Sequence, residues 1–318
     1  MAKYETDILL ATYNGSAYLP ELLASLDAQS NQNWRLIARD DGSTDSTVEQ
    51  LRNWGSAHGD RFVLIEDGRK NLGSMLNFGA LFDRSDADYF MPCDQDDFWI
   101  SDKVERLSSR LKSLEARQGK NTPLIVHSDL IVADINLNPI AESFWKYQRI
   151  RLPPEKNPWK LGTLQNSVTG CAMIGNRALL DTALPIPVDA MMHDWWFALV
   201  AALFGDIKGE TVPTVRYRQH ETNTLGARDL STRELLRLIV SQPNTLYQQV
   251  KDSIQRSQKQ SGAVTKRFAD RLTPEQVAFF EEYSGLPKFG FLKRKSFPFR
   301  HQLHYYDPIR IAGFLWVL

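Results

Sequence analysis

Three carboxylates stand close together at Asp94, Asp96 and Asp97, directly behind an apolar run that is typical of a strand. Like charges at this spacing repel, so something must neutralise them. Alternate residues of an extended loop point the same way, so Asp94 and Asp96 can face one ligand. Carboxylate oxygens suit Mg²⁺ or Mn²⁺, whose shell substrate phosphates complete. The spacing predicts a divalent-cation site; the alternative is that Asp96 and Asp97 only cap the helix that begins near Ser101.

Three other polar clusters also follow predicted strands: Thr12-Tyr13-Asn14-Gly15, Asp40-Asp41-Gly42-Ser43 and Asn71-Leu72-Gly73. Taken alone, each is typical of a turn with a helix cap. In open α/β sheets, however, ligands bind beyond the carboxyl ends of the strands. Four polar clusters on one rim are harder to explain as caps, and together they favour a ligand site.

Apolar strands and amphipathic helices must alternate to place these clusters on one rim. The first half of the chain shows this alternation, with strands expected at 7–12, 34–39, 61–66 and 87–92 and helices between and after them. Such alternation predicts a parallel sheet covered on both faces. Further along we expect strands at 124–132 and 170–175, an extended segment at 211–217, helices at 193–204, 231–257 and 273–283, and a loop at 255–262.

Composition bounds the class of protein. The chain has 318 residues, of which 42% are hydrophobic, enough for one large core or two small ones. Lys+Arg and Asp+Glu are equal at 38 each, which gives no overall attraction to nucleic acid or membrane. Two cysteines provide no disulfide framework, and the first residues lack the apolar region of a secretory signal. We therefore expect a cytoplasmic protein.

The C-terminal tail differs from the rest of the chain. Between Lys288 and Arg310 it carries six basic residues and one acidic residue, Asp307, interleaved with Phe, Tyr and His. Two interpretations stay open. One is a face that contacts an anionic membrane peripherally, at its inner side. The other is a packed helical layer with arginines on its surface. No nucleic-acid fold signature accompanies the patch.

The order of the polar clusters resembles the family 2 glycosyltransferases of the GT-A fold. It is most similar to the bacterial rhamnosyltransferase-like branch, which builds cell-surface polysaccharides such as O-antigen. The likeness covers about Asp7 to Asn223 and rests on four motifs: Ala11-Thr12-Tyr13-Asn14-Gly15, Asp40-Asp41-Gly42-Ser43-Thr44-Asp45, Asn71-Leu72-Gly73 and Cys93-Asp94-Gln95-Asp96-Asp97-Phe98-Trp99.

The resemblance implies a fold and a division of the chain. The fold is α/β, with a Rossmann-like, mostly parallel sheet flanked by helices and a helical C-terminal region. The glycosyltransferase domain would span 1–225, with a nucleotide-sugar half at about 1–131 and an acceptor half at about 132–225. The helical region would span 226–318.

The resemblance also implies roles for the first clusters. Thr12 and Tyr13 would line the base pocket, and Asp41 would accept a hydrogen bond from N3–H of a uracil or thymine. Asp94 would lie near the ribose and diphosphate. Asp96 would bind the metal that bridges the diphosphate.

A general base is the next element that the family requires. Asp194 matches it, because this residue begins an apolar helix and can take the proton of an acceptor hydroxyl. Trp195 or Trp196 would supply a face for sugar stacking. The alternative is an ordinary helix cap in front of a tryptophan core.

The family then has a basic segment that bears a histidine. His220 would complete the metal shell or touch the diphosphate, and Arg216 or Arg218 would neutralise the leaving group. Alternatively, Arg218 and His220 are ordinary surface residues. His127 and Asp129 are weaker candidates for the acceptor site, because a core histidine explains the pattern as well.

The implied activity is an inverting, metal-dependent hexosyltransferase. The donor would be a dTDP- or UDP-sugar, with dTDP-rhamnose favoured, and the acceptor a hydroxyl of a glycan or lipid-linked glycan. Asp97 has no assigned role. Two other functions remain: a nucleotidyltransferase, which usually has a Gly-rich basic loop that Ala11–Gly15 lacks, and a nucleotide-sugar-binding partner protein without turnover.

Overall fold

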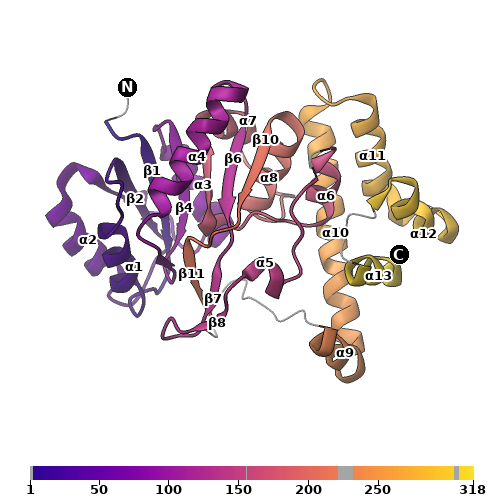
Figure 1. The fold of residues 1–318 in the computed structure, drawn as a ribbon, viewed down its shortest axis with the longest axis horizontal. Helices are drawn as coiled ribbons and strands as arrows, with labels where there is room; N and C mark the ends of the chain where they lie inside the picture. The colour runs from indigo at the N-terminus through magenta and orange to yellow at the C-terminus, as the bar shows by residue number, and fades with distance from the viewer. Residues whose placement is uncertain (1–2, 155, 221–231, 304–307) are drawn as a thin grey trace. The chain divides into compact units, whose positions relative to one another are not determined.

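The computed structural model describes residues 3–154, 156–220, 232–303 and 308–318 (Figure 1). The chain divides into two compact units, each assembled from separate segments. The first contains Met1–Phe144, Val168–Pro185 and Phe204–Ala227, and the second contains Trp145–Ser167, Ile186–Leu203 and Arg228–Leu318. The domain boundary predicted between 225 and 226 lies outside the described residues.

The first unit is built on a mixed sheet whose strand order is β10-β6-β9-β4-β1-β2-β3. Its strands are β1 (Thr6–Thr12), β2 (Trp34–Asp40), β3 (Phe62–Ile65), β4 (Tyr89–Asp94), β6 (Leu124–Ser128), β9 (Met173–Asn176) and β10 (Asp206–Glu210). Pairing is parallel except around β9, which runs antiparallel to β4 and β6. This confirms the predicted α/β class with a mostly parallel sheet.

Helices cover both faces of this sheet. They are α1 (Leu19–Asp27), α2 (Thr47–His58), α3 (Ser74–Arg84), α4 (Lys103–Gln118) and α7 (Arg177–Ala183). Alternate strand residues such as Ile8 and Leu10 join one core cluster with Leu22 of α1 and Leu107 of α4. On the opposite face, Phe82 of α3 meets Phe90 edge-on at 5.7 Å between ring centroids. The period-two alternation of each strand thus feeds two apolar layers.

The first unit also contains a smaller sheet, whose strand order is β5-β11-β7-β8. Its strands are β5 (Phe98–Trp99), β7 (Ile131–Ala133), β8 (Pro139–Ala141) and β11 (Val215–Arg218). The single strand expected at 124–132 is therefore wrong, because the chain leaves the main sheet after Ser128 and joins the small sheet at Ile131. The strand is interrupted locally, because the Asp129 carboxylate accepts the N–H of Leu130. That N–H is then not available for hydrogen bonding between strands.

The second unit is helical. Its helices are α5 (Phe144–Tyr147), α6 (Pro158–Leu164), α8 (His193–Phe204), α9 (Thr232–Ser241), α10 (Pro243–Phe268), α11 (Pro274–Gly285), α12 (Phe291–Arg300) and α13 (Pro308–Val317). The first residue of α5 and the last residue of α8 belong to the first unit. Buried aromatic rings hold these helices together, as where Trp196 stacks on Phe268 at 5.9 Å between ring centroids. Thr273 and Gln276 begin α11 with a capping box.

The loop expected at 255–262 is wrong, because α10 runs through it without a break. Four polar side chains there, Ser257, Gln258, Gln260 and Ser261, are buried on one side of the helix rather than exposed. Ser257 shares a hydrogen bond with the Tyr283 hydroxyl at 2.6 Å, and Gln260 accepts the N–H of Met191 at 2.9 Å. The predicted helix 231–257 is divided instead at Pro243, which begins α10.

Hydropathy adds one observation. Within the described residues, no helix combines the length and the apolar character that a membrane crossing requires.

Candidate functional site

The polar clusters predicted on one rim lie side by side in the first unit. The strand register pairs Thr12 with Asp40 and Ala11 with Asp94, so the carboxyl ends of β1, β2 and β4 finish together. The chain then turns away from the sheet at each of these ends, which leaves polar backbone and side chains at the edge. This is the place where an open α/β sheet holds a ligand.

Asp40 ties this edge together. Its carboxylate accepts the backbone N–H groups of Gly42 and Ser43 at 2.9 and 2.7 Å, and the hydroxyl of Thr12 at 2.9 Å. Gly42 adopts a φ of +96°, which favours glycine. The turn after β2 is therefore fixed by its own first aspartate, and Thr12 is buried beneath it.

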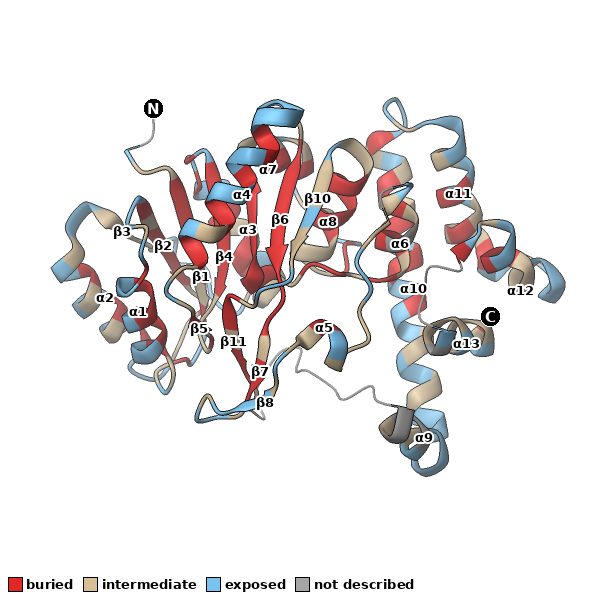
Figure 2. Ribbon diagram, in the orientation of Figure 1, coloured by how far each residue is buried: buried red, intermediate tan, exposed pale blue. Residues whose placement is uncertain are grey.

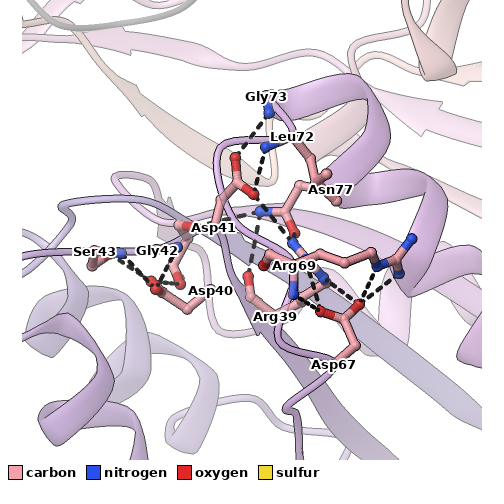
Figure 3. Close-up of polar contacts among 11 residues, drawn as sticks. Arg39, Asp40, Asp41, Gly42, Ser43, Asp67, Arg69, Leu72, Gly73 and Asn77 are labelled. Atoms are coloured by element: carbon pink, nitrogen blue, oxygen red, sulfur yellow. Dashed lines mark hydrogen bonds and ion pairs between the residues drawn. The ribbon is translucent and has the colours of Figure 1, made fainter.

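Asp41 points the other way, toward the loop that follows β3 (Figure 3). Its two oxygens accept the N–H of Leu72 at 2.9 Å and the N–H of Gly73 at 2.8 Å. Its backbone carbonyl accepts the N–H of Asn71, also at 2.9 Å. The structure thus joins the second and third clusters through Asp41, which the sequence placed in the base pocket. Contact of Asp41 with a base stays a prediction.

Arg39 lies beneath both clusters, and its guanidinium is fully buried. It donates to Asp67 at 2.9 and 3.1 Å and to Asn77 at 2.8 Å, and it pairs with Asp41 at 3.3 Å. Burial lowers the pKa of Arg39, but the hydrogen bonds and charges of Asp67 and Asp41 outweigh it and shift the pKa upward. The same guanidinium lowers the pKa of Asp67 well below its usual value. This network fixes the loop of residues 67–73 against β2.

Tyr13 is held by its backbone while its ring remains half exposed. The side-chain amide of Gln95 accepts the N–H of Tyr13 at 2.8 Å and donates to its carbonyl at 2.9 Å. Gly15 permits this approach, since a Cβ there would lie 2.2 Å from the Gln95 oxygen. Gln95 therefore links the acidic cluster to the first cluster and leaves the Tyr13 ring available for stacking.

Asp96 faces a histidine across the edge of the site. His220 Nε2 lies 2.7 Å from the Asp96 carboxylate, and the His220 ring stacks on Tyr18 at 4.7 Å between centroids. The two residues predicted as metal ligands are therefore adjacent, although 124 positions separate them in the chain.

Arg218 supports this turn from below. It donates to the backbone carbonyl of Asp96 at 2.9 Å, bonds the carbonyl of Ile135 and pairs with Glu21. Its side chain is almost fully buried, so it is not an ordinary surface residue. Its expected contact with a diphosphate stays a prediction. Residues 221–223 of the predicted basic segment lie outside the described residues.

The interior side of the acidic turn is different. Asp97 is fully buried, and neither carboxylate oxygen has a conventional hydrogen-bond partner; the Cys171 thiol is the group placed to donate to it. Burial, and then the charges of Asp96 and Asp94, raise the pKa of Asp97 well above its usual value. Burial therefore favours the neutral acid, and only positive charge nearby can keep Asp97 ionised.

Lys103 supplies that charge. Its buried ammonium lies 3.1 Å from the centroid of the Trp99 ring and bonds the carbonyl of Cys171. Burial lowers the pKa of Lys103 to about 8, while the nearby Cys171, Cys93 and Asp97 act in the opposite direction. Trp99 is thus a cation–π partner of Lys103.

The acidic turn has the chemistry to hold a divalent cation. Asp94, Asp97 and Cys171 each place one ligand atom within 4.8 Å of the others. Desolvation raises the pKa of the Cys171 thiol well above its ordinary value, as it does for the neighbouring Asp97. Asp96 and His220 form a separate pair on the other side of the turn, and their oxygen and imidazole ligands also fit Mg²⁺ or Mn²⁺.

Asp194 belongs to the second unit, in the first turn of α8. Its carboxylate accepts the N–H of Trp195 at 2.6 Å, and the Trp195 indole donates to the carbonyl of Gly162. Trp196 is fully buried against Phe268, so it packs in the core and cannot offer a sugar-stacking face. Asp194 as a general base stays a prediction.

His127 and Asp129 have structural positions. His127 is buried on β6, and desolvation lowers its pKa to about 3, so the ring is neutral. Asp129 accepts the hydroxyl of Ser143 and the N–H of Leu130. These contacts favour a core role for both.

Three residues of the site were not predicted: Arg39, Gln95 and Lys103. A signal existed for Arg39, because an arginine inside a buried strand demands a buried acceptor. Lys103 gave none, since a lysine in the first turn of an amphipathic helix is usually exposed.

Comparisons with known proteins point one way. The model of glycosyl transferase family 2 matches residues 7–179. The chain is 24% identical to dTDP-rhamnosyl transferase RfbG of Shigella flexneri over 233 residues, which is 69% of this chain and 74% of RfbG. It is 27% identical to EpsE of Bacillus subtilis over 136 residues, 42% of this chain. The chain spans about half of EpsE, since the match covers 48% of it.

Solved structures agree on the fold. S. aureus TarS 1–349, in complex with UDP-GlcNAc, superposes with a TM-score of 0.54 at 16% identity, covering 98% of this chain and 90% of TarS 1–349. The mannosyltransferase PcManGT of Pyrobaculum calidifontis, in complex with GDP-Man and Mn²⁺, gives a TM-score of 0.54 at 13% identity, covering 100% and 86%. At these identities the likeness establishes a GT-A-like fold.

Proposed function

Because the chain belongs to glycosyl transferase family 2, we propose that it transfers a sugar from a nucleoside diphosphate sugar to a hydroxyl of a glycan or lipid-linked glycan in polysaccharide synthesis. The observation that carries the proposal is the convergence of four polar clusters at one edge of the sheet, with Asp96 set 2.7 Å from His220. With a lipid-linked acceptor, the enzyme would work peripherally at the inner face of a membrane.

The donor we propose is dTDP-rhamnose. Support comes from the relative named as a dTDP-rhamnosyl transferase. The half-exposed Tyr13 ring would stack on the thymine, and Asp41 would accept its N3–H. Because the Asp41 oxygens already bond Leu72 and Gly73, the same residue would couple base binding to the loop of residues 67–73. Other nucleotide sugars occur in the fold neighbours, UDP-GlcNAc in TarS and GDP-Man in PcManGT.

The acidic turn would hold Mg²⁺ or Mn²⁺ through Asp96 and His220, with Asp94 toward the ribose and diphosphate. When bound, the cation would offset the negative charge that develops on the leaving diphosphate. Arg218 holds the backbone of Asp96, so it would position the turn as well as contribute positive charge. Lys103 would keep the interior side of the turn neutral while Asp97 supports it.

Asp194 would act as the general base. The acceptor hydroxyl gives its proton to the carboxylate while its oxygen forms a bond to the anomeric carbon. The bond from that carbon to the diphosphate oxygen breaks, and its electron pair leaves with the diphosphate. Attack from the opposite face inverts the anomeric centre in one displacement.

A thermal-shift screen tests the donor site first. The full chain is melted with UDP-, dTDP- and GDP-sugars, with and without Mn²⁺. We expect the largest rise in Tm with dTDP-rhamnose and Mn²⁺ together. If Tm does not rise with any nucleotide sugar, with or without Mn²⁺, the proposal of a donor site is contradicted.

Turnover separates the transferase from a binding protein. Asp194→Asn should retain the donor-induced rise in Tm but reduce product formation about 10²–10⁴-fold. Unchanged product formation would overturn the assignment of the base, and no product from the unsubstituted protein with any donor would favour a binding role.

A further inference from the structure

The segment around α12 concentrates positive charge. Between Pro287 and Leu303 the chain has no acidic residue. It carries five basic residues: Lys288, Lys293, Arg294, Lys295 and Arg300. Glu282 of α11 pairs with Arg300 and His301. The local charge is therefore strongly positive in a chain that is neutral overall.

One side of α12 packs into the second unit. Phe297 is fully buried, and its ring lies 5.5 Å from the rings of both Phe279 and Tyr283. Pro298 is buried beside it. This side confirms part of the interpretation that the tail forms a packed layer.

The other side carries large apolar residues in solvent. Phe291 is 61% exposed, Leu292 81% and Phe299 69%. Leu292 and Phe299 are seven residues apart and Phe291 and Phe299 eight, about two helical turns, so they share one face. Figure 2 shows exposed colour at both ends of α12 and buried colour between them.

Lysines border this apolar face. Lys293 is exposed and lies 3.6 Å from the ring of Phe289, whereas Lys295, 5.1 Å from the ring of Phe291, donates to the carbonyl of Leu315 in α13. Lys288 is exposed at the preceding turn. Aromatic and aliphatic tips framed by long basic side chains match the boundary between acyl chains and anionic headgroups, because the lysine stems can lie along apolar surface while their charges reach phosphates.

We propose that the outward face of α12, formed by Phe291, Leu292 and Phe299 with Lys288 and Lys293, docks peripherally on a lipid bilayer that contains anionic lipids. Charge complementarity argues for this occupant over a second copy of the chain, which would bring two positive faces together. With this proposal, the packed layer and the membrane face predicted for the tail would lie on opposite sides of one helix. The inference extends the proposed function and rests on it only for the acceptor; the binding itself requires no sugar transfer.

The experiment is vesicle flotation with the full chain, using phosphatidylcholine vesicles with and without phosphatidylglycerol. We expect binding to the anionic vesicles and little to the neutral ones. Replacing the three apolar residues together, Phe291→Ser, Leu292→Ser and Phe299→Ser, should weaken binding roughly tenfold or more. Lys288→Glu with Lys293→Glu should weaken it by a similar factor at low salt and by less at high salt.

Matched controls keep the test specific. Ile140→Ser, Val188→Ser and Val212→Ser together remove side chains that are also exposed, at 52%, 97% and 43%, and should leave binding unchanged. Lys120→Glu with Lys259→Glu makes the same charge change at exposed positions outside α12. Equal loss in test and control variants would overturn the proposal, as would a Ser variant that floats like the unsubstituted chain.

Two further readouts separate the failures. Sugar transfer to a soluble acceptor should be unchanged in the α12 variants. Loss of flotation with normal transfer would support α12 as the membrane-binding surface. Normal flotation without transfer by the unsubstituted chain would contradict the proposed function but not the membrane binding. If size-exclusion chromatography shows that the Ser variant only dissociates a dimer while flotation is unchanged, the face joins copies of the chain and the membrane proposal falls.

Discussion

Two turns at the same edge of the sheet, residues 40–43 and 94–97, both carry adjacent aspartates but treat them differently. In the first, Asp40 and Asp41 are surrounded by backbone N–H donors and the Arg39 guanidinium. In the second, Asp96 faces the imidazole of His220, and Asp97 is buried without a conventional donor. Hydrogen bonds satisfy the first pair, whereas Asp97 of the second pair is buried with the charge of Lys103 nearby.

The difference indicates that residues 40–43 fix the conformation of the loops, whereas residues 94–97 provide negative charge. A carboxylate that accepts several N–H bonds fixes a loop and needs no ion. Carboxylates that share a site with few donors raise one another's affinity for protons or metal. At this edge of the sheet, we therefore expect a bound cation to lower the electrostatic free energy most at the acidic turn. The first turn sets the shape that surrounds it.

The largest expected effect follows from the acidic turn. Asp96→Asn should reduce kcat/KM about 10²–10³-fold, because an amide is a weak ligand for Mg²⁺ or Mn²⁺. The same variant should require more Mn²⁺ for half-maximal activity. Steady-state kinetics over a Mn²⁺ series measures both.

Asp83→Asn is the control for that measurement, since Asp83 is an exposed acidic residue on α3. It should leave kcat/KM and Tm unchanged. Metal-independent activity of the unsubstituted protein after chelation, with an unchanged rate in Asp96→Asn, would show that the two turns do not differ in the way proposed.

The next effect concerns the hydrogen-bonded turn. Arg39→Met should lower the free energy of unfolding by about 2–4 kcal/mol, because it leaves Asp41, Asp67 and Asn77 without their buried donor. Urea unfolding of the full chain, followed by tryptophan fluorescence, measures the decrease in the free energy of unfolding. The donor KM should rise more than kcat falls, since the loop of residues 67–73 would shape the proposed base pocket.

Arg52→Met is the matched control for Arg39→Met. Arg52 also pairs with a carboxylate, that of Glu66, but both side chains are more than half exposed. Its substitution should cost under about 1 kcal/mol. Equal losses in the two variants would contradict the structural role of Arg39.

The sequence predicted the edge because its signals are local. Polar clusters directly behind strands such as 7–12 and 87–92 specify both the sheet and its carboxyl end, and the structure places Thr12, Asp40 and Asp94 in one register. The extended segment expected at 211–217 contains most of β11, but the small sheet as a whole was not predicted, because strands of two or three residues such as β5 and β8 are too short to show a period. The partners of Arg39 and Lys103 depend on tertiary contacts, which no window of sequence contains.

A smaller effect concerns the interior of the acidic turn. Lys103→Met and Asp97→Asn should each destabilise the first unit, because each leaves the other group buried with less compensation. The double variant should be less destabilised than the sum of the two, with a coupling free energy of about 1–2 kcal/mol. Urea unfolding of all four proteins completes the cycle. Additive losses would mean that Lys103 serves only Trp99 and the Cys171 carbonyl.

The smallest effect returns to the hydrogen-bonded turn. Ser43→Ala removes one hydroxyl donor from Asp40, which still accepts the N–H groups of Gly42 and Ser43 and the hydroxyl of Thr12. It also removes the acceptor of the Asn14 N–H, which is exposed and can bond water instead. The free energy of unfolding should therefore fall by only about 0.5–1 kcal/mol. Thr12→Val should cost more, about 1–2 kcal/mol, because Thr12 is buried and links two strands. If Ser43→Ala cost as much as Arg39→Met, the carboxylates of this turn would not be held redundantly, and the contrast with the acidic turn would disappear.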